Sequence, residues 1–117
     1  MQASYPRKFL GDCAWVEFGS EEEAKVSRAI LRSPDELIVE FSHNGWLYTV
    51  PLQRSGKADF RCKWTARQGS STDSGTATCR LYTSEEDMLL FGTWVEGGTN
   101  FAWSLKLDEV EHFPDEG

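Results

Sequence analysis

The sequence predicts a mainly β domain: an antiparallel meander of about seven strands, forming a barrel or half-barrel, with one helix near residues 21–32 after the first strand. Three observations support this prediction. The 117 residues have the length of a single domain. Five Trp, seven Phe and three Tyr are a large aromatic share, and aromatic residues favour strands. Apolar and polar residues alternate along most of the chain, which is typical of strands with one face in water.

The first two elements are a short apolar strand at residues 13–18 and the helix at residues 21–32. Ser20 and Glu23 form a capping box, and three acids in a first turn suit the helix dipole. Three apolar residues then follow the spacing of one helix face: Val26, Ala29 and Ile30. The Ser-Pro pair at 33–34 ends the segment. A further strand stays open as the alternative, because Val26, Arg28 and Ile30 also alternate.

Six more strands are expected, at residues 36–42, 46–52, 60–67, 76–82, 88–96 and 99–107. The strand at 60–67 shows the clearest alternation of faces. Its apolar face carries Phe60, Cys62, Trp64 and Ala66. Its polar face carries Arg61, Lys63, Thr65 and Arg67. Because hairpin turns join the strands in chain order, the sheet should be an antiparallel meander.

The connections between these strands are short or polar. Asn44-Gly45 is a strong hairpin signal, and Gly97-Gly98 should form a second tight turn. Residues 68–75 are predicted to be a polar, mobile loop, and residues 84–87 a charged turn. Within the single domain 1–117, residues 108–117 are predicted to be an acidic, flexible tail.

One hairpin resembles a known group of barrels. Residues 91–98 read Phe-Gly-Thr-Trp-Val-Glu-Gly-Gly, and residues 101–105 read Phe-Ala-Trp-Ser-Leu. This pattern resembles the Gly-x-Trp strand and return strand of calycin-like (lipocalin-like and avidin-like) small β-barrels. The resemblance implies a calycin-like shape with an aromatic side chain pointing into the barrel. The sequence departs from that pattern in two ways. Lipocalins place Gly-x-Trp on the first strand, whereas here it lies on the sixth predicted strand. Lipocalins and avidins have eight strands, whereas seven are predicted here.

Composition argues against several classes of partner. Nineteen acids and twelve bases give a formal net charge of −7, whereas nucleic-acid binding depends on an excess of Lys and Arg. No apolar run approaches the roughly 20 residues of a membrane span. The first ten residues lack the apolar region of a secretory signal, so we expect a cytoplasmic protein that binds neither nucleic acid nor membrane.

The residues that carry most enzyme chemistry are scarce. His43 lies in a predicted turn and His112 in the predicted tail, and no nucleophile and base are recognisable, so we expect no enzyme and no cofactor. The cysteines have no C-x-x-C spacing, which disfavours a metal site. Cys62 and Cys79 should face inward on neighbouring strands. We expect free thiols, and a disulfide stays open.

The inward-facing aromatics suggest a small-molecule binding module. A pocket at the barrel mouth is predicted for a small apolar or aromatic ligand, with a carboxylate to orient a polar group. Its residues are Trp46, Tyr48, Trp94, Glu96 and Trp103. The alternative is that these side chains only fill the interior, as small barrels usually require.

The outward face of the sheet suggests a second function, a protein–protein interaction or regulatory module with no small ligand. Four basic residues should share the outer face of two paired strands: Arg61, Lys63, Arg67 and Arg80. A basic face on an acidic protein could bind an acidic partner. The alternative is a solvated face that discourages aggregation at sheet edges.

Overall fold

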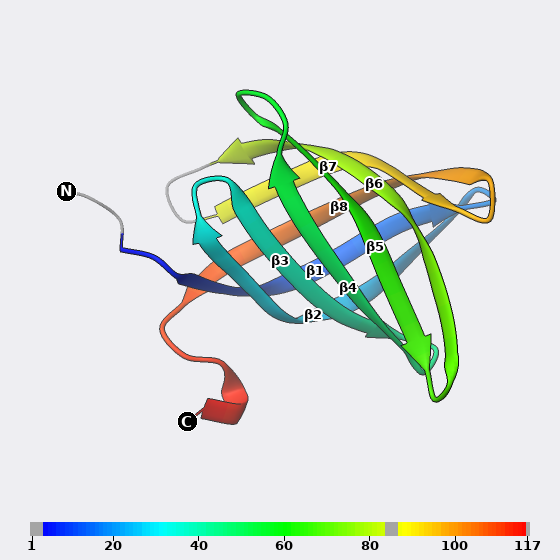
Figure 1. Ribbon diagram of the computed structural model, residues 1–117, viewed down its shortest axis with the longest axis horizontal. Coiled ribbons are helices and arrows are strands. Elements are labelled where there is room, and N and C mark those ends of the chain that lie inside the picture. The colour runs from blue at the N-terminus through cyan, green and yellow to red at the C-terminus, as the bar shows by residue number, and fades with distance from the viewer. Residues whose placement is uncertain (1–3, 84–86, 117) are drawn as a thin grey trace.

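The computed structural model describes residues 4–83 and 87–116, and it shows a closed barrel of eight antiparallel strands in chain order (Figure 1). The strands are β1 (Arg7–Glu17), β2 (Ser20–Ser33), β3 (Glu36–His43), β4 (Trp46–Arg54), β5 (Asp59–Gln68), β6 (Ser71–Thr83), β7 (Asp87–Glu96) and β8 (Thr99–Val110). β1 pairs with both β2 and β8, which closes the sheet and leaves no edge strand. The predicted antiparallel meander is confirmed, and the barrel is closed.

The predicted helix at 21–32 is wrong, because this segment is strand β2 and raises the strand count from seven to eight. A β-bulge explains the misleading pattern. The register against β3 shifts between Val26 and Arg28, which inserts one extra residue into β2. The buried residues on either side of the bulge, Val26 and Ala29, are therefore three apart, as on a helix face, instead of two apart.

The polar loop predicted at 68–75 is shorter than expected. Only Gly69 and Ser70 form the turn, and residues 71–75 belong to β6, where they pair with residues 64–68 of β5. Ser71–Ser74 are exposed, and Thr72 and Ser74 share the outer face of the sheet with their partners Arg67 and Thr65. Backbone pairing does not need apolar side chains, so the polar sequence is compatible with a strand. The three residues 84–86 of the charged turn predicted at 84–87 lie outside the described residues.

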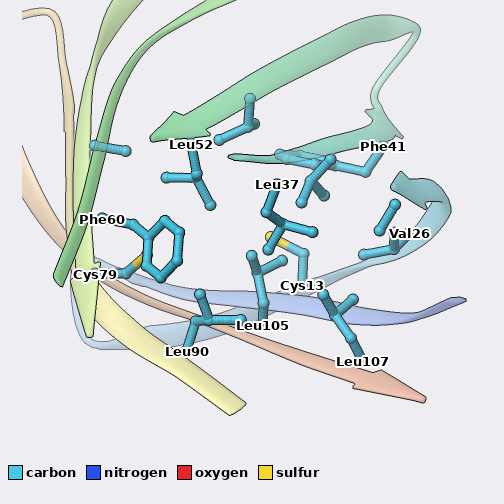
Figure 2. Close-up of a cluster of buried hydrophobic side chains, with 14 of the residues drawn as sticks. Cys13, Val26, Leu37, Phe41, Leu52, Phe60, Cys79, Leu90, Leu105 and Leu107 are labelled. Atoms are coloured by element: carbon cyan, nitrogen blue, oxygen red, sulfur yellow. The ribbon is translucent and has the colours of Figure 1, made fainter. Parts of the chain in front are cut away.

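The barrel interior is filled by one side of every strand (Figure 2). Phe60 from β5, Leu37 from β3 and Leu105 from β8 are each at most 1% exposed. No polar or charged residue is buried in the described part of the chain, and no buried side-chain nitrogen or oxygen there lacks a hydrogen-bond partner. The buried core of the described part of the chain is therefore apolar.

Two tryptophan side chains each lie across a glycine of the neighbouring strand and reach the backbone of the strand beyond it. Trp64 on β5 lies opposite Gly75 on β6, and its indole Nε1–H donates to the carbonyl oxygen of Val95 on β7 at 3.2 Å. Trp103 on β8 lies opposite Gly92 on β7, and its Nε1–H donates to the carbonyl oxygen of Thr78 on β6 at 3.0 Å. A Cβ at Gly75 would overlap the Val95 carbonyl and the Trp64 ring, and one at Gly92 would overlap the Thr78 carbonyl. Glycine is needed at both positions because a neighbouring backbone approaches closely.

The two ends of the barrel differ. One end, called here the mouth, carries the β1–β2, β3–β4, β5–β6 and β7–β8 turns, and both described termini lie toward the other end (Figure 1). The predicted Asn44-Gly45 turn has φ of 51° and 81°, and Gly97-Gly98 has 59° and 80°, as in type I′ hairpins. Of the tail predicted at 108–117, residues up to Val110 belong to β8, and Phe113 is buried against Arg28, whose guanidinium carbon is 4.4 Å from the ring centroid.

Replacing Gly92 tests whether the Trp103 indole must lie across a residue without a side chain. We expect Gly92→Ala to lower the free energy of unfolding by at least about 2 kcal/mol, because the new methyl group displaces the β6 backbone that accepts the Trp103 hydrogen bond. Urea unfolding measures this change. Thr93→Ala alters the next, exposed side chain and should cost less than about 1 kcal/mol. Equal losses for the two variants would contradict the packing described.

Candidate functional site

A small cavity opens inside the barrel at the mouth. It has a volume of about 40 Å³ and is lined by residues of β1, β3, β4, β7 and β8. The lining residues are Cys13, Trp15, Phe41, Tyr48, Trp94, Glu96, Phe101 and Trp103. At roughly 10–15 Å³ for each water, the cavity holds about three waters. It therefore suits a small group rather than a large ring system.

Four of the five predicted ligand residues line this cavity: Tyr48, Trp94, Glu96 and Trp103. Trp46 does not. Trp46 is the first residue of β4 and pairs opposite His43, two residues before Tyr48. Its side chain is partly buried and packs against the core. Its inward face was predictable from the alternation, but its distance from the cavity depends on how far each strand reaches into the mouth.

Sequence reasoning missed the other half of the lining: Cys13, Trp15, Phe41 and Phe101. Phe41 and Phe101 lie in two of the predicted strands, and the pairing of Phe41 with Tyr48 and of Phe101 with Trp94 places them at the cavity. Trp15 reaches it because β1 closes the barrel against β8, where Trp15 pairs with Trp103. That closure has no local signal in the sequence.

The aromatic walls of the cavity are packed against one another. Phe41 and Tyr48 stack with ring centroids 4.8 Å apart and planes 6° apart. Trp94 stacks on Trp64 at 4.6 Å and 15°, and it meets the edge of Trp103 at 5.3 Å and 65°. Offset stacking and edge-to-face contact are the favoured aromatic geometries. The walls are therefore held in place by the rings behind and beside them.

Glu96 is the charged residue among those that line the cavity. It lies two residues after Trp94 on β7 and so faces the same side of the sheet. The Trp94 Nε1–H donates to Glu96 Oε1 at 3.0 Å. This bond fixes the carboxylate at the cavity wall beside the indole.

Three carboxylates act on the Tyr48 hydroxyl at the mouth. The pKa of Tyr48 is raised to about 12, first by burial of its hydroxyl and then by the charges of Glu96, Asp73 and Glu17. These three carboxylates come from β7, β6 and β1. None of the cavity-lining residues is basic. The mouth therefore favours positively charged groups over negatively charged ones.

Phe18 stands at the rim of the mouth in an unusual state. It occupies the β1–β2 turn with φ of 49°, next to Gly19 at 81°, and its side chain is 90% exposed. Asn44-Gly45 uses nearly the same angles with the residue that such turns prefer. The Phe18 ring meets the edge of Phe101, a cavity-lining residue, at 6.3 Å. A bulky residue at positive φ with its ring in water is a local cost that stability does not explain.

The four predicted basic residues all lie exposed on the outer face of β5 and β6. Arg67 pairs opposite Thr72 near the mouth, whereas Arg80 pairs opposite Asp59 near the other end. Arg61 and Lys63 lie between them. At about 3.3 Å per residue, the span of β5 from Asp59 to Arg67 makes the basic stripe about 26 Å long, so it is not a compact patch. Beside it, the β4–β5 ladder is interrupted around Pro51, which has no N–H to donate.

The three cysteines are free. Cys62 on β5 pairs opposite Ala77 and Cys79 on β6 opposite Phe60, so the two cysteines lie on neighbouring strands, as predicted, and are diagonal neighbours there. Burial raises the pKa of Cys13, Cys62 and Cys79 to about 12 in each case. These thiols are therefore protonated and weakly nucleophilic at neutral pH.

Within residues 4–83 and 87–116, no three His, Cys, Asp or Glu side chains gather so that they could hold a metal ion. The same residues contain no helix long and apolar enough to cross a membrane. Comparison of the chain with protein-family models gives no match, and comparison with curated proteins gives none either. The function is therefore argued from the geometry of the site.

Burial of Cys13 predicts a loss of stability at high pH. An unfolded thiol loses its proton near pH 9.0, whereas folded Cys13 keeps it to about pH 12, so the folded state binds more protons between these values. The free energy of unfolding then falls as pH rises, by about 1.4 kcal/mol per pH unit for such a group. Urea unfolding in reductant at pH 9 and pH 10.5 should show a fall for the wild type that is larger than for Cys13→Ala by up to about 2 kcal/mol. Parallel falls would mean that Cys13 ionises freely in the folded protein.

Proposed function

We propose that this protein binds a small molecule in the cavity at the barrel mouth. One observation carries the proposal: aromatic side chains from several strands surround a space that they do not fill, with a single carboxylate on its wall. An eight-stranded barrel is just wide enough to be filled by its side chains or to hold one small ligand. Pockets of this kind combine apolar walls with a few placed polar groups.

The size of the cavity limits what enters it. A space for about three waters accepts a small head group, and the rest of a larger ligand would lie on the rim. Phe18 and Phe101 supply an aromatic surface at that rim. The cost of an exposed phenyl group at positive φ is explained if the Phe18 ring contacts the bound ligand. The proposed ligand therefore has a small group in the cavity and an apolar part against Phe18.

We propose binding rather than catalysis. Cys13 is the one thiol on the cavity wall, and its raised pKa keeps it protonated. No histidine is among the lining residues, and His43 instead packs edge-on against Trp15 at 4.7 Å. A nucleophile with an adjacent base is thus missing from the cavity wall.

A second candidate function is a protein interaction through the basic stripe of Arg61, Lys63, Arg67 and Arg80. The observation in its favour is that all four side chains are exposed on one outer face, although the chain carries a net charge of −7. An extended acidic segment of a partner matches a stripe of this length. Replacing all four basic side chains by glutamine and measuring the loss of affinity for an acidic partner would test this function separately from the cavity.

A ligand screen tests the small-molecule proposal. Compounds of varied charge and polarity are added, and melting temperature and tryptophan emission are recorded together. A ligand of the cavity should raise the melting temperature and change the emission, because it binds only the folded state and touches Trp94 and Trp103. Phe101→Ala should weaken binding by about tenfold or more, since it removes apolar wall area.

Phe91→Ala is the matched control for Phe101→Ala. It makes the same substitution on the neighbouring strand, but the Phe91 side chain is exposed and lies outside the cavity lining. Binding should be unchanged in this variant. A screen without any compound that alters tryptophan emission, or ligands equally sensitive to both variants, would contradict a site at the mouth.

A further inference from the structure

We propose that the group bound in the cavity is a methylated ammonium, so that the mouth is a site for a small organic cation. This inference rests on the small-molecule function proposed above and assigns its ligand class. Three properties of the cavity carry it: the orientation of its rings, the sign of its charge and the shortage of hydrogen-bond acceptors on its wall.

Several of the aromatic rings that line the cavity lie at steep angles to one another, and one pair is stacked. The Phe41–Tyr48 stack forms one wall, and Trp94 lies at 62° to Tyr48. The Trp103 plane lies at 65° to the Trp94 plane. Trp15 and Phe101 complete the aromatic lining. Ring faces carry negative charge density, and a cation within about 6 Å of their centroids is attracted to them, most strongly by tryptophan.

The charge at the cavity strengthens this preference. Glu96 contributes a carboxylate to the wall, and its Oε1 is held by the Trp94 N–H at 3.0 Å. Donation of that hydrogen bond to an anion makes the Trp94 ring richer in electrons. Glu17 and Asp73 add negative potential at the same end of the barrel. An anionic ligand would be repelled, and a neutral one would gain nothing from these groups.

The chemistry of the wall distinguishes between classes of cation. A metal ion needs several oxygen, nitrogen or sulfur ligands, and the described residues provide no group of three. A guanidinium carries five N–H donors, whereas the side chains on the wall offer only the Glu96 carboxylate, the Tyr48 hydroxyl and the weakly accepting Cys13 sulfur. A methylated ammonium presents methyl groups to the rings and needs few acceptors or none. Its size also suits a cavity for about three waters.

Titration with matched probes tests the ligand class. Tetramethylammonium chloride and trimethylammonium chloride are compared with tert-butanol, a neutral compound of similar shape, and with sodium chloride as the control for ionic strength. Tryptophan emission and the indole N–H signals in NMR spectra report binding. We expect the ammonium ions to bind at least about tenfold more tightly than tert-butanol.

A pair of charge variants locates the effect. Glu96→Gln keeps an oxygen for the Trp94 N–H but removes the negative charge, and it should weaken binding of the ammonium ions by about tenfold. Glu111→Gln makes the same change beyond the end of β8 at the other end of the barrel, and it should leave binding unchanged. We expect the methylated ammonium group to belong to a small molecule and not to a protein side chain. Tighter binding of a short peptide containing trimethyllysine than of tetramethylammonium would contradict that source.

The outcomes separate this inference from the proposed function. Equal affinity for tert-butanol and the ammonium ions, or no effect of Glu96→Gln, would overturn the cation site, while a ligand from the wider screen that depends on Phe101 would keep the small-molecule function. If neither the ammonium ions nor any screened compound alters tryptophan emission, both proposals fail.

Discussion

The mouth of this barrel depends on one packing constraint: two tryptophan side chains lie across glycine residues of the neighbouring strands. Trp64 and Trp103 each pass over a glycine on the neighbouring strand and bond the carbonyl of the strand beyond it. Each indole thus ties three strands together inside the barrel. Trp94 lies between them, stacked on Trp64 at 4.6 Å and edge-on to Trp103 at 5.3 Å. The position of the cavity wall therefore follows from two hydrogen bonds and two residues without side chains.

This arrangement gives the site its rigidity. The rings that line the cavity are supported by other rings, and Glu96 is held by the Trp94 N–H. A pre-organised wall loses little conformational freedom when a ligand binds, so more of the interaction energy is retained as affinity. Phe18 is the exception, because its exposed ring is held by a turn and by a single edge contact with Phe101. It is the ring at the mouth with the fewest contacts to hold it in place.

Much of the fold was predictable from alternation and turns, and the failures have physical causes. The faces of β5 and the Asn44-Gly45 turn are local properties, and both were predicted correctly. The bulge in β2 placed Val26 and Ala29 three residues apart and imitated a helix. Four of the residues predicted at the mouth line the cavity, because they share inward faces near one end. Trp15 and Phe41 were missed because their place depends on barrel closure and on register, which no single strand encodes.

Hydrogen exchange of the five indole N–H groups tests the central claim most directly. NMR spectra recorded in D₂O, with signals assigned by Trp→Phe substitutions, give one rate for each indole. The structure predicts that Trp64 and Trp103 exchange far more slowly than Trp15 and Trp46, for which no indole hydrogen bond is found in the described part of the chain. Exchange of Trp64 or Trp103 as fast as that of Trp46 would show that the indoles do not bond across the glycines, and the account of the mouth would be wrong.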